Sequence, residues 1–284
     1  CLTMPLSPSQ TTALLDRLGH LPKKKLGQNF LIDGNIVDKS IQLADLPSSG
    51  NVLEIGPGLG TLTRKLLESG QTVHAVELDQ RLAENLENTE TEAIKSEQLY
   101  ITRGDAVKNP LGSLPEAITQ YAIVANLPYA ISSAWLESVL NTGRVPHRMV
   151  LMMQKEAVER IWADSGTKEY HALSIFISNA YEFTEKHSVS RQCFYPAPAV
   201  DSMLIRMDLK NDAFLFPKQV RKLIRKIFTQ RRKQLGSLAK KEDLITKKAI
   251  FEWLDSLNQP YTSRPEQIST EGWKKLGELL ADYN

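Results

Sequence analysis

The chain has 284 residues, of which 42% are hydrophobic and 24% charged, a composition typical of a folded globular protein and unlike that of a disordered one. No apolar run approaches the ~18 residues that a membrane-spanning helix needs. Cys1 and Cys193 show no metal-ligand or CxxC spacing, so neither a disulfide framework nor a metal site is expected. The first residues lack the pattern of a signal or transit peptide, and a cytoplasmic location is expected.

Basic residues are concentrated in one segment. Residues 218–248 hold twelve lysines and arginines against two acidic residues, a charge of +10; since the whole chain carries +2, the remainder carries −8. Such asymmetry indicates a surface that binds a polyanion, although a solvated helix face is the commoner cause of a charge run. A second basic cluster, Lys23–Lys25, favours nucleic acid as the partner.

The apolar pattern predicts alternating strands and helices over most of the chain. Residues 1–22 are polar and rich in turn formers, and we expect a loosely held arm there. Strands are expected at 51–55, 72–76, 99–102, 122–125 and 149–153, with an edge strand at 202–208. Helices are expected at 34–46, 61–69, 80–88 and 131–141.

This alternation predicts an α/β fold with a Rossmann-like, doubly wound and mainly parallel sheet. From Phe216 onward the pattern is helical, basic and free of strands, which indicates a second, small all-helical domain. The expected organisation is therefore an arm at 1–22, an α/β domain at 23–212 and a basic helical domain at 213–284. The chain shows no long apolar seam of the kind an obligate dimer needs, so a monomer is expected.

A glycine-rich turn follows the first predicted strand. Gly56, Gly58 and Gly60 lie between that strand and the next helix, where glycine lets the backbone approach a ligand closely. Glu77 ends the second strand, in the place where a carboxylate accepts hydrogen bonds from a ribose diol. The spacing is GxGxG rather than GxGxxG, and no Walker lysine follows, which favours S-adenosylmethionine (SAM) over a dinucleotide or ATP.

Asp105 follows the third predicted strand at the same edge of the sheet. An aspartate in this position often only caps a turn. Because ligands gather at the carboxyl ends of the strands in an open α/β sheet, its carboxylate is also a candidate acceptor for the adenine amine of the cofactor.

The tetrapeptide Asn126-Leu127-Pro128-Tyr129 ends the fourth strand. The Asn126 side-chain oxygen and the Leu127 main-chain oxygen could both accept from an exocyclic amine. They would favour the amine as its lone pair localises, which stabilises the transition state more than the ground state. Tyr129 offers a flat face for a base, although a turn with a packed tyrosine is an equally ordinary reading.

Phe194 begins the proline-rich segment Phe194–Pro198. Such segments usually connect elements and their aromatics usually pack. An aromatic on a rigid loop can also hold a splayed-out base, and Phe194 opposite Tyr129 would enclose one adenine.

Several motifs together resemble those of one enzyme family, in its order and spacing. They are Lys25–Leu31 (KLGQNFL), Glu54–Gly60 (EIGPGLG), Asn126–Tyr129 (NLPY), Gln154–Glu156 (QKE), Phe194–Ser202 (FYPAPAVDS) and Phe228–Lys233 (FTQRRK). Over about residues 20–280 the chain resembles the bacterial small-subunit rRNA adenine N6,N6-dimethyltransferases of the KsgA/RsmA type. It departs at Ala130, where relatives often carry Asn.

The resemblance implies a class I methyltransferase fold and a small helical domain, with SAM as methyl donor and no metal. It implies dimethylation of two adjacent adenines in a hairpin loop near the 3′ end of 16S rRNA during small-subunit biogenesis. It also implies a catalytic pocket of Asn126, Leu127 and Tyr129 with Phe194 as second wall, and rRNA contacts from Lys23–Lys25 and the helical domain. The SAM contacts implied are Asn29, Leu31, Gly56, Glu77, Asp105 and Asn126.

Three other functions fit parts of the pattern. An Erm-type 23S rRNA adenine methyltransferase shares the fold but usually has Ile in place of Leu127. A non-catalytic rRNA-binding assembly factor would have a degraded cofactor pocket, whereas Gly56, Glu77 and Asp105 are present here. A DNA adenine methyltransferase often carries an acidic residue at the position of Asn126.

Overall fold

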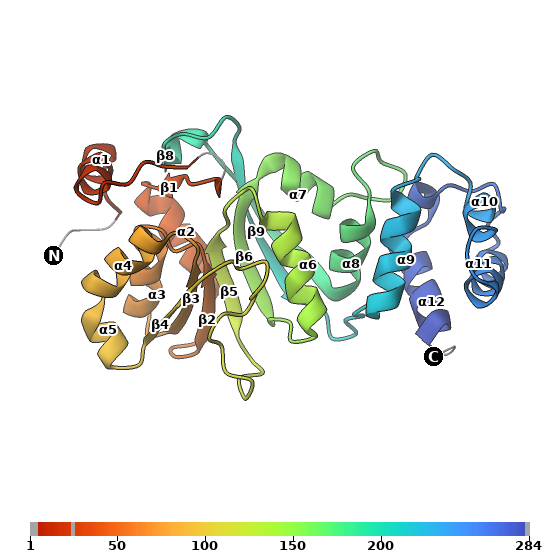
Figure 1. Ribbon diagram of the computed structural model, residues 1–284, viewed down its shortest axis with the longest axis horizontal. Coiled ribbons are helices and arrows are strands. Elements are labelled where there is room, and N and C mark those ends of the chain that lie inside the picture. The colour runs from red at the N-terminus through yellow and green to blue at the C-terminus, as the bar shows by residue number, and fades with distance from the viewer. Residues whose placement is uncertain (1–4, 24–25, 282–284) are drawn as a thin grey trace. The chain divides into compact units, whose positions relative to one another are not determined.

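The computed structural model describes residues 5–23 and 26–281 and divides into two compact units (Figure 1). The first comprises residues 1–157 and 183–208, and the second residues 158–182 and 209–284. These units differ from the expected domains at residues 158–182, and the C-terminal boundary falls after residue 208 rather than 212. Residues 158–182 belong with the C-terminal helices because α8 (Ala172–Ala180) packs against α9 (Lys218–Phe228) and α12 (Thr270–Ala281).

A seven-stranded sheet forms the centre of the first unit, in the order β4-β3-β2-β5-β6-β9-β7. The first five strands in this order pair in parallel, and β9 runs antiparallel to β6. The predicted doubly wound, mainly parallel sheet is thus confirmed. The strand bounds are β2 Asn51–Ile55, β3 Thr72–Glu77, β4 Leu99–Arg103, β5 Ala122–Asn126, β6 Arg148–Gln154, β7 Tyr181–Val189 and β9 Ser202–Leu209.

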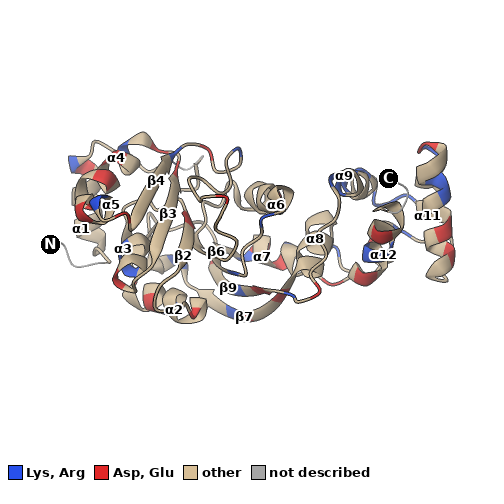
Figure 2. Cartoon of the chain, turned by 90° about the horizontal axis from the view of Figure 1, so that it is seen from below, with Lys and Arg blue, Asp and Glu red and all other residues tan. Residues whose placement is uncertain are grey.

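Helices cover both faces of this sheet (Figures 1 and 2). α2 and α3 pack on one face through an apolar core that includes Val37, Leu66 and Val52, and α6 lies on the other. Asp33 and Asp79 cap α2 and α4 with their side chains, which places the starts of both helices where the sequence predicts them. The helix bounds are α2 Gly34–Ala44, α3 Thr61–Glu68, α4 Gln80–Thr89, α5 Thr91–Lys95, α6 Ser132–Thr142 and α7 Lys155–Ile161.

Two sequence predictions about the first unit are wrong. The strand β9 is not at the edge, because β7 pairs beyond it. β7 carries exposed charged and polar side chains along most of its length, as an edge strand does, and so shows no apolar alternation. The expected loose arm contains the helix α1 (Pro8–Arg17), whose Leu14 and Leu15 pack against Leu82.

A short antiparallel ladder joins β1 (Phe30–Leu31) to β8 (Phe194–Tyr195). The strand β8 directly follows the 3-10 helix η2 (Arg191–Cys193). Ile32 N–H extends the contact by donating to the Cys193 carbonyl at 2.9 Å. The ladder therefore fixes the segment after the GQN motif beside the proline-rich segment, although they are far apart in sequence.

The second unit is helical and, over the described residues 216–281, free of strands, as predicted. Its core is aromatic. The ring centroids of Trp253 and Trp273 lie 4.8 Å apart, and Phe228 packs against Trp273. None of the helices in the described chain is long and apolar enough to cross a membrane. The elements not yet given are α10 Leu235–Ala239, α11 Leu244–Ser256 and η3 Pro265–Gln267.

Candidate active site

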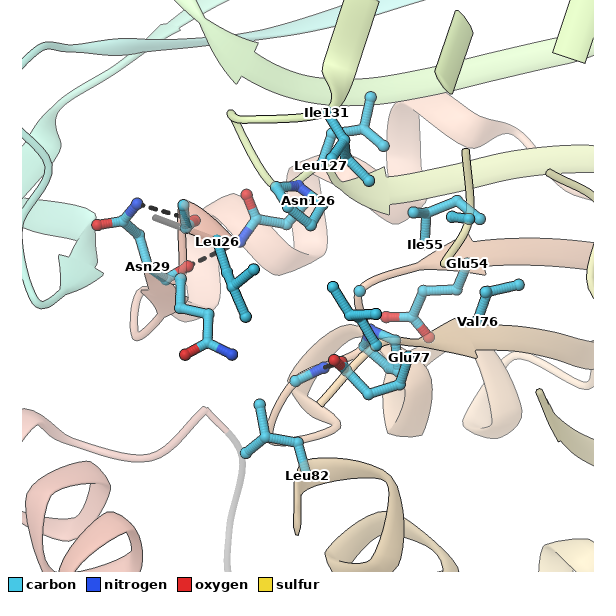
Figure 3. A pocket seen from close by; sticks show the side chains of 18 of the residues that line it. Leu26, Asn29, Glu54, Ile55, Val76, Glu77, Leu82, Asn126, Leu127 and Ile131 are labelled. Carbon is cyan, nitrogen blue, oxygen red and sulfur yellow. Dashed lines mark hydrogen bonds between the residues drawn. The ribbon is translucent and has the colours of Figure 1, made fainter. Parts of the chain in front are cut away.

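A cavity of about 1040 Å³, including the part open to solvent, lies at the carboxyl ends of β2, β3, β4 and β5 (Figure 3). We call it the sheet-end cavity. Strand order reverses between β2 and β5, and such a switch point is where open α/β sheets bind ligands. Its lining comes from five parts of the chain, namely Leu26–Leu31, Glu54–Leu59 with Thr61 and Leu62, Val76–Leu78 with Leu82, Gly104–Ala106 and Asn126–Ile131. Eight of the predicted site residues line it: Asn29, Leu31, Gly56, Glu77, Asp105, Asn126, Leu127 and Tyr129.

Two glycines allow three of these segments to meet. Gly56 has φ +68°, and a Cβ there would lie 2.8 Å from Pro128 Cγ. Gly27 has φ +65°, and a Cβ there would lie 2.8 Å from the Tyr129 main-chain nitrogen. A side chain at either position would thus strain the backbone and push apart the walls of the cavity.

The Glu77 carboxylate is anchored by two main-chain donors. Gly58 N–H donates to Oε2 at 3.1 Å and Asp79 N–H donates to Oε1 at 2.8 Å, while the residue is 5% exposed. Burial raises the pKa of the Glu77 carboxyl, and the main-chain hydrogen bonds oppose this shift. The anchoring directs a fixed acceptor into the cavity, at the end of β3 where the sequence predicts a ribose site.

Glu54 also lines the cavity, and sequence reasoning assigned it no role. It is 2% exposed, and its Oε2 accepts a hydrogen bond from Thr63 Oγ1 at 2.7 Å. Burial raises the pKa of the Glu54 carboxyl to about 8; the Thr63 hydrogen bond opposes this shift and the charge of Glu77 adds to it. The carboxyl is therefore mainly neutral at pH 7. The signal that could have drawn attention to it is an acidic residue inside an otherwise apolar strand.

Glu54→Gln is expected to flatten the dependence of stability on pH. Because the pKa of Glu54 is higher in the folded chain than in the unfolded chain, the folded chain holds a proton that the unfolded chain has released. The stability that this proton contributes is complete below the unfolded pKa of 4.5 and is lost as the pH rises through about 8. The loss is about 1.4 kcal/mol per unit of pKa difference. Urea midpoints between pH 5 and 9 should fall less for Glu54→Gln than for the wild type or the exposed control Glu68→Gln; equal slopes would contradict the raised pKa.

Asp105 combines the two roles weighed for it. Its Oδ1 accepts from Val107 N–H at 2.9 Å, as in a turn cap, and its side chain also lines the cavity. A carboxylate can accept further hydrogen bonds beside such a cap, so Asp105 remains able to bind a ligand amine.

The Asn126 carboxamide is held in one orientation. Its Nδ2 donates to the Asn29 main-chain oxygen at 3.1 Å, and Asn29 Nδ2 in turn donates to the Gly27 oxygen at 3.1 Å (Figure 3). Because a carboxamide has one oxygen and one NH₂ group, binding the NH₂ leaves Oδ1 as the acceptor of the pair. The GQN segment thus determines how Asn126 presents its oxygen.

Tyr129 is held by a buried serine that does not itself line the sheet-end cavity. Its hydroxyl is hydrogen-bonded to Ser202 Oγ at the start of β9, and Ser202 is 1% exposed. Burial raises the pKa of the Tyr129 hydroxyl, so it stays protonated at neutral pH. Ser202 lies within the FYPAPAVDS motif, but the sequence alone did not connect it with Tyr129.

Tyr129→Phe and Ser202→Ala should each lower kcat by about 2- to 10-fold, the size of one net hydrogen bond. The double variant should be no worse than either single variant, because both remove the same contact. Ser40→Ala is the matched control, since its buried hydroxyl bonds only the Ile36 carbonyl within α2. Additive losses in single-turnover rates would show that the Tyr129–Ser202 contact does not position the ring.

Phe194 lies outside the set of residues that line the cavity. It pairs with Leu31 in the β1–β8 ladder, and its 2% exposed ring packs in the core with Val189 and Leu204. The expected enclosure of an adenine between Phe194 and Tyr129 is not formed by the side chains as they lie, because the ladder places this ring in the core.

The basic residues of the second unit are not all exposed. Arg221 is 7% exposed and donates to the Phe216 carbonyl, and the Arg225 guanidinium lies 5.8 Å from the Phe176 ring centroid. Arg231 donates to the carbonyls of Thr167 and Lys168. These three arginines stabilise the unit. The exposed cations of the segment are Lys218, Lys222, Lys226, Arg232, Lys233, Lys240, Lys241 and Lys248.

The second basic cluster is only partly described. Lys24 and Lys25 lie outside the described residues, whereas the Lys23 ammonium binds Asp79 Oδ2 at 2.6 Å. Lys23 is therefore engaged within the protein.

The side chains of the sheet-end cavity fit SAM. Among the described residues, the lining holds the carboxylates of Glu77 and Asp105 beside the mainly neutral Glu54, and it holds no Lys or Arg. This charge suits a cationic sulfonium nucleoside and not a pyrophosphate. Within the described ranges, no group of three or more His, Cys, Asp or Glu side chains could hold a metal ion. Fold and cavity together define a class I SAM-dependent methyltransferase.

The comparisons with known proteins narrow this class. The model of the family described as ribosomal RNA adenine dimethylase matches residues 19–256. The chain is 46% identical over 277 residues to the ribosomal RNA small subunit methyltransferase A of Opitutus terrae, covering 96% of this chain and 98% of that one. This chain belongs to the ribosomal RNA adenine dimethylase family.

Two solved structures share the fold. A dimethyladenosine transferase from Plasmodium falciparum is 28% identical with a TM-score of 0.69, over 87% of this chain and 95% of that one. The 23S rRNA methyltransferase ErmE is 25% identical with a TM-score of 0.61, over 89% and 100%.

Proposed function

We propose that this protein is a SAM-dependent rRNA methyltransferase that dimethylates N6 of two adjacent adenines in a hairpin loop near the 3′ end of 16S rRNA. The observation that carries the proposal is the oriented Asn126 carboxamide. Its oxygen is left as the acceptor at the end of β5, where it lines the sheet-end cavity. The name of the Opitutus terrae relative supports the small subunit as the target. The proposal places a monomer on the assembling subunit, in the cytoplasm.

The cofactor end of the site is formed by residues from all four strand ends. SAM, when bound, supplies an electrophilic methyl group on a sulfonium. Glu77 accepts hydrogen bonds from the ribose hydroxyls, and Asp105 accepts from the adenine amine. Main-chain hydrogen bonds to both carboxylates keep these acceptors in place before the ligand arrives. Asn29, Leu31, Gly56 and Asn126 complete the contacts.

The catalytic end must make a poor nucleophile react. The lone pair of the target amine is delocalised into the adenine ring, so attack requires it to localise on nitrogen. Asn126 Oδ1 and the Leu127 carbonyl accept from the two N–H groups and favour that tetrahedral arrangement. Tyr129 stacks on the base, with its ring held through Ser202. No strong base is needed, because the nitrogen becomes acidic once the methyl group is attached.

The RNA backbone is bound by the exposed lysines of α9. Lys218, Lys222 and Lys226 recur every four residues and are all exposed, so they share one face of this helix. Lys226 is already paired with Glu242, which leaves Lys218 and Lys222 as the stronger candidates.

Reversing the charge of Lys218 and Lys222 to Glu should weaken rRNA binding and reduce its salt dependence, because each phosphate contact adds about one unit to the logarithmic salt slope. Lys275→Glu, exposed on α12, is the control. Filter binding from 50 to 300 mM salt measures both quantities. Unchanged affinity and slope would show that this face of α9 is merely solvated.

The test of the function is methyl transfer from isotope-labelled SAM to immature small subunits, followed by mass spectrometry of the rRNA adenines. Dimethyladenine at two adjacent positions of 16S rRNA is the expected result. Label in 23S rRNA would instead support the ErmE-like activity, and label in DNA a DNA methyltransferase. Binding to the subunits without label would support a non-catalytic assembly factor.

A further inference from the structure

A polar cluster around the buried side chains of His20 and Asp79 lies beside the sheet-end cavity, and none of the roles proposed above uses it. It consists of His20, Lys23 and Gln28 from the N-terminal segment and Asp79 from the turn after β3. Asp79 is 5% exposed and His20 is 3% exposed. Buried charged groups are retained only when they are paired, so these contacts hold the two segments together.

The contacts form a closed network around Asp79 and Gln28. Lys23 Nζ binds Asp79 Oδ2 at 2.6 Å, and His20 Nδ1 lies 3.6 Å from Asp79 Oδ1. Gln28 Oε1 is 3.0 Å from His20 Nε2 and also accepts from Lys23 N–H at 2.8 Å. Burial raises the pKa of the Asp79 carboxyl, but the hydrogen bond and charge of Lys23 outweigh this effect, and the net pKa lies below its usual value. Asp79 is thus held as the anion that this network requires.

Asp79 also contacts the cofactor side of the site. Its N–H donates to Glu77 Oε1 at 2.8 Å, and its Oδ1 caps α4 through Arg81 N–H and Leu82 N–H. One residue therefore connects the carboxylate assigned to the ribose with the segment that leads into the 26–31 wall of the cavity.

Apolar packing supports the same arrangement. Leu14 and Leu15 of α1 form a cluster with Phe30, Leu59 and Leu82, of which the last three also line the cavity. The His20 ring meets the Phe30 ring edge to face at 6.5 Å. The N-terminal segment is thus attached to the cavity by one apolar and one ionic set of contacts.

We propose that Asp79 is a positioning residue for the cofactor: by binding Lys23 and His20, it holds the 26–31 wall of the sheet-end cavity against the Glu77 carboxylate. The proposal rests on SAM as the ligand of the cavity and is independent of the RNA substrate.

The test variant is Asp79→Asn. Asparagine keeps an oxygen to cap α4 and the N–H that binds Glu77, but it removes the charge that holds Lys23 and His20. The Kd for SAM by calorimetry, and KM for SAM, should rise about tenfold, which corresponds to one charge-assisted hydrogen bond. At saturating SAM the kcat should fall by a smaller factor than the KM rises, because bound SAM restores the 26–31 wall, whose Asn29 carbonyl orients Asn126. Amide hydrogen exchange of residues 26–31 in the SAM-free variant should be faster.

Two further variants make the test specific. Lys23→Gln, which removes only the partly exposed cation, should raise the Kd in the same direction by a smaller factor. Asp38→Asn is the matched control, because Asp38 pairs with Lys65 at 2.9 Å on the exposed side of α2. It should change neither the Kd nor the exchange.

The proposal is overturned if Asp79→Asn binds SAM with the wild-type Kd. It is also overturned if the Kd rises while exchange of residues 26–31 stays unchanged, since the effect would then come from α4 or Glu77 alone. Both readouts need no RNA. A wild-type protein that binds SAM but does not label small-subunit rRNA would therefore refute the proposed function and leave this inference intact.

Discussion

Asn126→Ala is expected to lower the rate of methyl transfer by about two to three orders of magnitude, the usual loss when one transition-state hydrogen-bond partner is removed. The loss follows from Oδ1, which the Asn29 carbonyl leaves free as an acceptor by binding the Nδ2 group. Single-turnover rates on immature small subunits measure the effect. Affinity for rRNA should stay near that of the wild type, because the proposed phosphate contacts come from the lysines of α9.

Asn126→Asp tests the effect of side-chain orientation on the rate at nearly constant side-chain size. An ionised aspartate would place an oxygen against the Asn29 carbonyl, where the structure requires a donor. We expect low activity at neutral pH and partial recovery on acidification, because a protonated carboxyl can donate to that carbonyl. Asn141→Ala, exposed near the end of α6, is the control. Near-normal turnover of Asn126→Ala would remove Asn126 from the catalytic assignment.

Glu77→Ala is expected to raise the Kd for SAM by about 100-fold or more, since each hydrogen bond to a charged acceptor contributes about 1.5–3 kcal/mol. The variant also leaves Gly58 N–H and Asp79 N–H without their acceptor. Glu77→Gln keeps an oxygen and should show a smaller rise. Calorimetry measures both without RNA.

The same carboxylate predicts a pH dependence of cofactor binding. Because burial raises the pKa of Glu77, protonation begins at a higher pH than for an ordinary glutamate. The affinity for SAM should therefore decrease as the pH falls through this value, and Glu77→Gln should lack that decrease. Glu84→Gln, at a partly exposed residue of α4 that pairs with Arg103, is the control. An unchanged Kd in Glu77→Ala would contradict the ribose role.

Strand ends were the most predictable part of the molecule. The apolar segments at β2, β3 and β5 are bounded by glycine, aspartate or proline, and their sequences predict the observed strands to within a residue or two. Parallel strands place their carboxyl ends at one edge of the sheet. The positions of Gly56, Glu77, Asp105 and Asn126 in one cavity could thus be predicted from sequence alone.

The burial of charged residues was not predictable in this way. Arg221 and Arg225 look like members of a cationic surface, yet one is buried on the Phe216 carbonyl and the other packs on Phe176. Glu54 looks like an ordinary acidic residue, yet it is enclosed beside Thr63. Composition counts charges, whereas burial depends on which elements pack together.

By itself, the sequence determined the class of sheet, the edge at which a ligand binds and the residue types that face it, because each depends on a short apolar segment and the few residues that follow. Only the tertiary structure decided that Asn29 orients Asn126, that Ser202 holds Tyr129, that Phe194 lies in the core and that Asp79 joins the N-terminal segment to Glu77. These pairs are separated by tens of residues and meet through packing and strand pairing, which no local pattern specifies.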